Sequence, residues 1–199
     1  MSVTVITYAV IMVRWEPDAR GRLGQAAFQL FAERGFEQVT VAEIAERAGL
    51  TERTFFRYFA DKREVLFAGA DGFQEIFVSG VASAPDSAAP IEAVAGALYA
   101  AAAMFLAHEG GARRRAAIIA AHPDLREREL VKLATVASAV ADALRRRGVT
   151  DPAASLTAEA GLAVFRIAFA RWIAAPDGPD LARLIAESLD ELKLVAAGK

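Results

Sequence analysis

The sequence contains no cysteine and only two histidines, His108 and His122. Without cysteine the chain has no disulfides and no thiolate metal ligands, which is compatible with a reducing cytoplasm. The two histidines are not clustered, and no residues stand at a metal-ligand spacing, so we expect no metal and no other cofactor. An all-helical enzyme needs a nucleophile with a base, paired carboxylates or a metal set. The composition therefore disfavours catalysis.

A long hydrophobic run is also missing. The apolar stretch from Val3 to Val13 is too short for a membrane span of about 20 residues. It has neither the basic start nor the small-residue cleavage site of a signal peptide. We predict that residues 1–16 form a disordered or loosely docked arm, or that they follow from an upstream start codon, with Met12 as the true first residue. The alternative, an arm that reaches the minor groove, would want more Arg or Lys. No membrane partner is expected.

No strand pattern follows residue 16, and apolar residues recur at helical spacing to the end of the chain. The predicted fold is all-α, with about nine helices. A loop rich in Ser, Pro and Asp spans residues 83–90 and is followed by an alanine-rich region. The 199 residues suit one large or two small domains. We place the domains at 17–66 and 67–199, joined by a helix that continues from Asp61 through Phe77.

The stretch from 40 to 63 has the layout of a helix-turn-helix. Thr40 and Glu43 form a Thr-x-x-Glu capping box at the start of the first helix. Gly49 stands where a helix end needs a left-handed residue, which glycine adopts at little cost. Thr51 can cap a second helix that runs to Phe59. Two capped helices joined by a glycine turn are typical of a DNA-binding unit.

The charge of this stretch is nearly balanced, as is the net charge of −2 for the whole chain. The basic residues crowd the second helix and its exit, whereas two of the four acids, Glu43 and Glu46, lie on the first helix. A local basic edge suffices to meet phosphate, with moderate and salt-sensitive affinity. The basic residues are Arg47, Arg53, Arg57, Lys62 and Arg63, and the acids are Glu43, Glu46, Glu52 and Asp61.

The run from Gly49 to Phe59, followed by residues 61–66, resembles the signature of the TetR family of transcriptional regulators. Residues 26–36 are similar to that family's first helix. The resemblance covers roughly residues 18 to 67. It implies a helix-turn-helix head, followed by a helical domain that binds a ligand and dimerises.

In a helix-turn-helix the N-terminal residues of the second helix face base edges in the major groove. Arg53 and Arg57 share a face, and arginine is the usual bidentate reader of guanine. Threonines at helix N-termini are suited to hold phosphates. The resemblance implies that Tyr58 and Lys62 touch the DNA backbone or bases. The predicted DNA-binding residues are Thr40, Thr51, Arg53, Thr54, Arg57, Tyr58 and Lys62.

One position departs from the family pattern. Phe56 stands where the family often has tyrosine, so a hydroxyl that would contact phosphate is missing there. Lys62 and the capping threonines are then expected to supply more of the phosphate contact. Phe55 and Phe59 are assigned to the core.

The helix predicted from 153 to 175 is apolar nearly all round, so it must be buried on several sides. A subunit interface, with the last helix beside it in a four-helix contact, explains this pattern. A core helix of a monomer explains it too, but the family resemblance favours a homodimer. The predicted interface residues are Leu162, Phe169, Trp172, Ile173, Leu184 and Leu192.

Aromatic residues at helical spacing either line an effector pocket or form plain core. Arg166 either pairs with Glu159 or serves as the counter-ion of an acidic effector. The run Arg113–Arg115 is either a solvated helix start or a site for a phosphate-bearing ligand such as an acyl-coenzyme A. The candidate pocket residues are Phe73, Phe77, Tyr99, Met104, Phe105, Phe165 and Arg166.

The prediction is a cytoplasmic, ligand-responsive repressor that is not an enzyme. It binds a near-palindromic double-stranded DNA operator as a homodimer, and a small, largely apolar effector, acidic or resembling acyl-coenzyme A, induces it. An interaction protein that has lost DNA binding is the alternative from another class. The sequence names neither the operator nor the effector.

Overall fold

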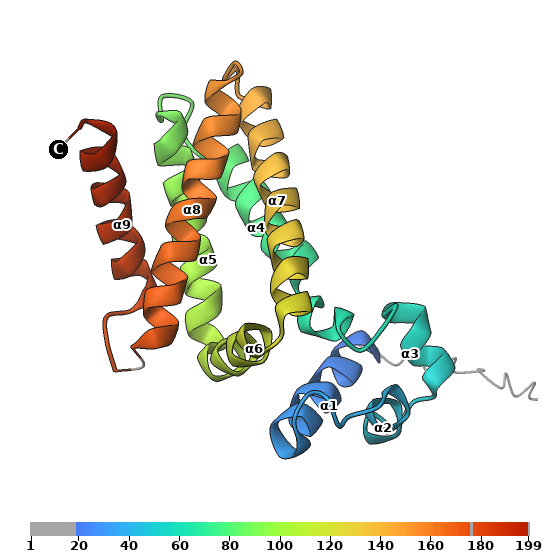
Figure 1. Cartoon of the computed structure of the whole chain (residues 1–199). Coiled ribbons are helices and arrows are strands. Elements are labelled where there is room, and N and C mark those ends of the chain that lie inside the picture. The colour runs from blue at the N-terminus through green and yellow to red at the C-terminus, as the bar shows by residue number, and fades with distance from the viewer. Residues whose placement is uncertain (1–18, 176, 199) are drawn as a thin grey trace, which may run out of the picture. The chain divides into compact units, whose positions relative to one another are not determined.

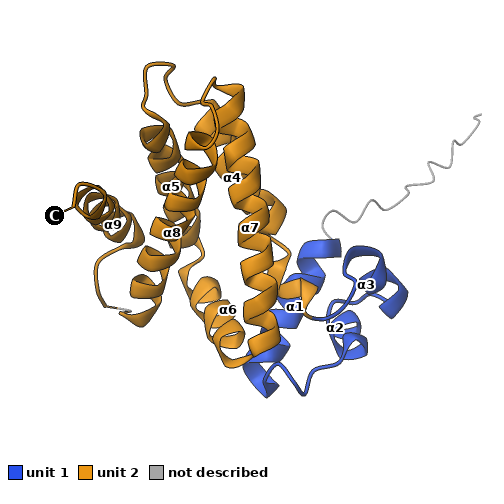
Figure 2. Ribbon diagram, turned by 45° about the horizontal axis from the view of Figure 1, so that its top comes forward, with its two compact units in different colours: residues 1–62 blue, residues 63–199 orange. Residues whose placement is uncertain are grey.

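The computed structural model describes residues 19–175 and 177–198. Over these ranges the regular elements are nine α-helices and one 3-10 helix, which confirms the all-α prediction. The chain divides into two compact units, residues 1–62 and 63–199 (Figure 2). This division falls shortly before the boundary after residue 66 that the sequence suggested. The predicted arm, residues 1–16, lies outside the described residues.

The first unit contains three helices: α1 (Ala19–Arg34), α2 (Val41–Arg47) and α3 (Glu52–Tyr58). Helix α1 packs against both of the others. Its buried face carries Leu23 and Leu30, and the side chains of Ile44 and Phe55 are fully buried as well. This small core fixes the relative orientation of α2 and α3.

The turn between α2 and α3 forms as predicted. The Thr40 N–H donates to Glu43 Oε2 over 2.8 Å, and the Glu43 N–H donates to Thr40 Oγ1 over 3.3 Å, which completes the capping box. Gly49 has a φ of +66°, and the Leu50 N–H donates to the Ala45 carbonyl over 2.8 Å. Thr51 caps α3 by accepting from the Thr54 N–H over 3.2 Å.

The prediction of one long helix from Asp61 was wrong. Residues Glu64–Phe67 form a 3-10 helix, η1, and α4 (Ala70–Ala82) begins only after Gly69. Gly69 has φ −90° and ψ 3°, outside the helical region. A glycine costs a helix about 1 kcal/mol relative to alanine, so Gly69 favours the break between η1 and α4, whereas Gly72 lies within the first turn of α4.

The second unit is a helical bundle (Figure 1). It contains α5 (Pro90–Ala107), α7 (Pro123–Arg146) and α8 (Ala153–Ala174) in addition to α4. The contacts run from α4 to α5 and α7, and from α8 to α5 and α7. Helix α9 (Leu181–Ala196) lies against α5 and α8, and α6 (Glu109–Ala121) connects α5 to α7.

Small residues let these helices approach closely. A Cβ atom added to Gly161 of α8 would lie 2.3 Å from Cγ1 of Val94 in α5. A Cβ atom at Gly80 of α4 would lie 2.8 Å from the Cα atom of Ala97. The backbone of α4 therefore contacts the backbone of α5 at Gly80, and the backbone of α8 contacts the Val94 side chain of α5 at Gly161, so α5 packs closely against both helices.

Three helical segments are long and apolar enough to cross a membrane when only length and composition are considered: Glu64–Ala82, Pro90–Ala107 and Ala153–Ala174. In the bundle these segments supply much of the shared core. The buried shares of their apolar windows are 28%, 33% and 39%. The absence of a membrane partner stays a prediction.

Candidate nucleic-acid interface and aromatic cluster

The outer face of α3 carries Arg53, Phe56 and Arg57, which lie three and four residues apart on one side of the helix. All three side chains are exposed, and Phe56 is 55% exposed. Phe55 and Phe59 are 0% and 3% exposed, as predicted for core residues, and they anchor the opposite face. We call Arg53, Phe56 and Arg57 the α3 face.

Phe56 is the member of the α3 face that sequence reasoning missed. It was treated only as a missing hydroxyl, although its spacing of three residues from Arg53 already placed the two on one side of the helix. An exposed phenyl ring on the same side of α3 as two guanidinium groups can make two kinds of contact in a major groove. The guanidinium groups match the O6 and N7 acceptors of guanine, and the ring matches the methyl group of thymine.

Tyr58 contacts its neighbour on the α3 face. Its hydroxyl accepts a hydrogen bond from Arg57 Nη2 over 3.1 Å, and the Arg57 Cζ atom lies 4.9 Å from the centre of the tyrosine ring. The Tyr58 side chain is 39% exposed. Tyr58 therefore orients Arg57 in the free protein.

The two capping threonines differ in what they can offer a phosphate. Thr40 Oγ1 donates to Glu43 Oε2 over 2.8 Å, and the Thr40 N–H lowers the pKa of that carboxyl below its ordinary value. An ionised Glu43 thus occupies the N-terminus of α2 and repels a second anion there. Thr51 and Thr54 share one hydrogen bond of 3.0 Å between their hydroxyls, so one hydroxyl proton remains available. The geometry favours Thr51 and Thr54 over Thr40.

Lys62 has a structural role that the sequence did not reveal. Its Nζ atom donates to the carbonyls of Phe36, Glu37 and Val39 over 2.9, 3.0 and 3.1 Å. It also lies 4.7 Å from the centre of the Phe36 ring. An ammonium group has three N–H donors, and all three are used here. The predicted phosphate contact by Lys62 therefore has no donor left in this arrangement.

We expect Lys62→Met to lower the free energy of unfolding by about 1–3 kcal/mol, because three backbone carbonyls, two of them in half-buried hydrogen bonds, lose a charged donor. Urea denaturation of the variant measures this change. The dependence of DNA affinity on salt is the control: it stays at the wild-type slope if Lys62 contacts no phosphate. A slope reduced by about one unit would restore Lys62 to the DNA contacts.

Ion pairs neutralise much of the remaining charge on α1 and α2. Arg47 donates both terminal N–H groups to the carboxylate of Glu33 over 2.9 Å, and this hydrogen bond lowers the pKa of Glu33. Arg34 pairs with Glu43 over 2.9 Å. Arg47 was predicted to belong to a local basic edge, but it pairs with Glu33 inside the first unit. Arg53 and Arg57 remain as the cations that α3 presents.

In the second unit, aromatic side chains from three helices gather in one place. Ring centres lie 5.2 Å apart for Phe73 and Phe165, and 5.0 Å apart for Phe105 and Phe169. Such spacings are those of interacting aromatic pairs. We call the set the aromatic cluster; its members are Phe73 and Phe77 of α4, Phe105 of α5, and Phe165, Phe169 and Trp172 of α8.

The other predicted pocket residues lie differently. Tyr99 is 41% exposed, and Arg166 is exposed as well, so neither belongs to the aromatic cluster. Met104 is half-buried on α5. The expected pairing of Arg166 with Glu159 is not among the ion pairs of the described residues, and both side chains face outward. In their place, Phe169 and Trp172, which were assigned to the dimer interface, join the cluster.

The arginine run of α6 is not a solvated helix start. Arg113 Nη1 donates to the Trp172 carbonyl over 2.6 Å, and Arg115 Nε donates to the Leu66 carbonyl over 2.7 Å. Only the side chain of Arg114, between them, is exposed. Both partners lie about 50 residues or more from the arginines in sequence, so local spacing gave no signal of these contacts.

Several predicted interface residues belong to the core of their own subunit. Leu162, Trp172 and Leu184 are each 3% exposed, and Phe169, Ile173 and Leu192 pack against the same core. The large apolar side chains that α8 exposes are Leu156 and Ile167, at 66% and 55%. On α9 they are Leu194 and Val195, at 48% and 64%. These four residues are the exposed large apolar side chains of α8 and α9.

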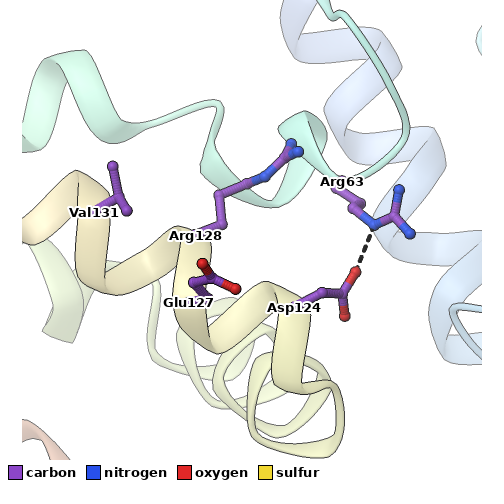
Figure 3. A pocket seen from close by; sticks show the side chains of 5 residues that line it. All are labelled: Arg63, Asp124, Glu127, Arg128 and Val131. Atoms are coloured by element: carbon purple, nitrogen blue, oxygen red, sulfur yellow. Dashed lines mark hydrogen bonds and ion pairs between the residues drawn. The ribbon is translucent and has the colours of Figure 1, made fainter.

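A polar pocket of about 510 Å³ lies in the second unit (Figure 3). It is lined by Arg63, Asp124, Glu127, Arg128 and Val131, and Arg63 Nε donates to Asp124 Oδ2 over 2.7 Å. Two cations facing two carboxylates give it no preference for an anion. Within residues 19–175 and 177–198 no three side chains are grouped to hold a metal ion.

Both parts of the chain match known protein families. Residues 24–68 match the family described as bacterial regulatory proteins, tetR family. Residues 88–196 match the MftR C-terminal domain.

Two curated sequences are similar to parts of this chain. The HTH-type transcriptional regulator TcmR of Streptomyces glaucescens is 37% identical over 81 residues, which is 41% of this chain and 36% of TcmR. The putative mycofactocin biosynthesis transcriptional regulator MftR of Mycobacterium tuberculosis is 44% identical over 43 residues, 22% of each chain. The chain thus matches about a third or less of the length of these relatives.

Among solved structures, the chain resembles FadR of Thermus thermophilus, a transcriptional repressor crystallised in complex with lauroyl-CoA. The two are 25% identical, with a TM-score of 0.56, over 86% of this chain and 91% of FadR. The similarity therefore extends over both units, beyond the helix-turn-helix segment.

Proposed function

Because the chain belongs to the TetR family of bacterial regulatory proteins, we propose that it is a transcriptional regulator that binds DNA in the cytoplasm. The observation that carries this proposal is the α3 face, where Arg53, Phe56 and Arg57 are exposed together at the end of a helix-turn-helix. Helix α3 enters the major groove, and its arginines read guanine while Phe56 contacts a thymine methyl group. Thr51, Thr54 and Tyr58 meet the phosphates beside them.

The regulator acts as a homodimer through α8 and α9. A symmetric dimer places two copies of α3 on DNA, so its operator is near-palindromic, with half-sites about one helical turn or a multiple apart. Exposed Leu156 and Ile167 on α8, together with Leu194 and Val195 on α9, supply the apolar contact. Alanines on the same side of α8 allow the two copies of this helix to approach closely.

The effector is a largely apolar molecule that binds at the aromatic cluster, and its binding releases the operator. An acyl chain suits such a site because it is apolar throughout and can lie between the rings of the aromatic cluster. Support comes from the similar repressor FadR of Thermus thermophilus, whose structure contains lauroyl-CoA. Release requires only that the effector bind more tightly to the form with low operator affinity.

Selection of random DNA duplexes by the full-length protein tests the DNA-binding proposal. We expect enrichment of one near-palindromic sequence, with a footprint that covers both half-sites. An asymmetric single site would contradict the dimer, and the absence of any enriched sequence would contradict DNA reading altogether.

We expect lauroyl-CoA to dissociate the selected operator, because its chain is long enough to contact several rings of the aromatic cluster. Fluorescence anisotropy of labelled operator measures the release. Coenzyme A without an acyl chain is the control and should have no effect, whereas lauric acid separates the contribution of the chain from that of the carrier. Equal release by coenzyme A alone would contradict an apolar effector site.

A further inference from the structure

The outward side of α8 carries an apolar stripe whose residues follow one another at alternating spacings of four and three. These spacings average 3.5 residues, the period at which two helices pack along each other's length. Its two large members, Leu156 and Ile167, are exposed, and its alanines are half-buried or exposed. Alanines between the large members allow a second helix to approach closely. We call this stripe the α8 seam; it consists of Leu156, Ala160, Ala163, Ile167, Ala170 and Ala174.

One edge of the α8 seam carries two opposite charges. Glu159 and Arg166 each directly precede a residue of the seam, and both side chains are exposed. Neither side chain has an ion-pair or hydrogen-bond partner among residues 19–175 and 177–198. They lie seven residues apart, whereas side chains on one helix meet at a spacing of three or four. The two charges therefore cannot neutralise each other within the subunit.

The opposite edge of the α8 seam differs. Val164 is buried there, and Arg171 is already paired with Glu187 of α9 over 2.8 Å. A parallel pair of α8 helices would bring the two different edges together and leave Glu159 facing a buried valine. An antiparallel pair brings the same edge of both copies together, because a two-fold axis perpendicular to the helices keeps that edge on one side. Only the antiparallel arrangement offers the free charges a partner.

A two-fold axis near Ala163 brings these charges together with the correct signs. Glu159 lies four residues before Ala163 and Arg166 lies three residues after it, so each is about one turn from the axis. Glu159 of one subunit then lies opposite Arg166 of the partner subunit, and the symmetry repeats the pair. In the same arrangement the large side chains Leu156 and Ile167 lie opposite alanines. Shape and charge thus favour the same register.

We propose that Glu159 and Arg166 form a self-recognition pair, through which this chain selects an antiparallel second copy of itself and rejects a seam with another order of charges. Each dimer holds two identical ion pairs, one on each side of the two-fold axis. The α8 seam supplies the apolar contact, whereas the charges beside it set partner and orientation. The inference rests on the proposed dimer through α8 and α9, and it identifies the residues that choose the partner.

Two single substitutions test the pair in the full-length protein without DNA. Glu159→Arg makes both charges of the edge positive, and Arg166→Glu makes both negative. In either homodimer two attractive pairs become two repulsive ones, so we expect the dissociation constant of the dimer to rise about tenfold or more. Sedimentation equilibrium measures this constant. The rise should shrink at high salt, because salt screens exposed charges.

A mixture of the two single variants provides the sharpest measurement. Subunits with Glu159→Arg and subunits with Arg166→Glu should pair with each other at about wild-type affinity, since a positive edge then meets a negative one. Such pairing also shows that both variants fold. The double variant restores opposite charges in reversed order, so it should form its own dimer and should not mix with the wild type. Native mass spectrometry of isotope-labelled subunits counts each species.

Glu75→Arg on α4 and Arg114→Glu on α6 are the matched controls, because both side chains are exposed and lie outside the α8 seam. Both should dimerise with wild-type affinity. The inference is overturned if the wild type is a dimer and each seam variant pairs with itself as well as with the other, or if the controls dissociate equally. A wild type that sediments as a monomer would give this face to another partner and overturn the proposed dimer as well. Because no readout involves DNA, failure of the operator selection would be a separate result.

Discussion

Ile167→Glu should convert the protein from a dimer to a monomer and lower its affinity for a two-half-site operator by on the order of a hundredfold or more. Ile167 is 55% exposed on α8, where the proposed interface requires an apolar contact. A symmetric interface brings two copies of the substitution together, so two carboxylates would be buried without partners. Without the dimer, each α3 must bind its half-site independently. Sedimentation velocity measures the oligomeric state, and anisotropy measures operator affinity.

Leu130→Glu is the matched control for this prediction. Leu130 is an apolar side chain of α7 that is 56% exposed, so the substitution changes the same charge at a similar exposure outside α8 and α9. We expect it to remain a dimer with wild-type affinity. The proposed interface would be wrong if Leu130→Glu dissociated the protein while Ile167→Glu did not.

The helix-turn-helix could be predicted from the sequence because its signals are local. The capping box joins Thr40 and Glu43, the Gly49 turn involves neighbours within five residues, and Thr51 caps α3 through Thr54. Each of these contacts is fixed by backbone geometry within a single turn. Spacing in the sequence therefore determines them almost completely.

Side chains that reach across the fold could not be predicted in the same way. Lys62 binds carbonyls that lie 23 to 26 residues earlier, and the Trp172 carbonyl that Arg113 contacts lies 59 residues later. A lysine or arginine side chain has the same neighbours in the sequence whether it extends into water, contacts a phosphate or donates to a distant carbonyl. Only packing of the helices decides among these. The family resemblance therefore assigned Lys62 to DNA, and the run Arg113–Arg115 was left as either a solvated helix start or a site for a phosphate-bearing ligand.

The dimer interface illustrates a related ambiguity. An all-round apolar helix such as α8 contains both core and interface residues, and helical periodicity does not separate the two. The largest side chains, including Trp172 and Leu162, pack inside the subunit, where they bury the most apolar surface. What remains outside on α8 is smaller or isolated: alanines, Leu156 and Ile167. Periodicity therefore does not show which side chains of α8 face the core, and the assignment of the interface to α8 and α9 stays a prediction.

Arg57→Ala should weaken operator binding by roughly 1–3 kcal/mol and relax discrimination at one base pair, if the guanidinium reads guanine. Arg57 is exposed on α3, and its contact with the Tyr58 hydroxyl holds it toward the outside of the helix. Alanine is compatible with the helix, so the loss of operator affinity reports the missing contact of the Arg57 side chain. Affinity measured on the selected operator, and on operators changed one base pair at a time, locates the position that Arg57 reads. Equal weakening on all sequences would instead make Arg57 a phosphate contact.

Phe56→Ala provides the complementary control on the same face, because it removes an apolar side chain and leaves both charges. Replacing one thymine by uracil deletes only a methyl group from the major groove. The wild type and Arg57→Ala should both bind the uracil operator less tightly than the thymine operator, whereas Phe56→Ala should bind the two equally. If Phe56→Ala still distinguished thymine from uracil at every position, the exposed ring would have no part in reading the sequence. The α3 face would then recognise DNA through its arginines alone.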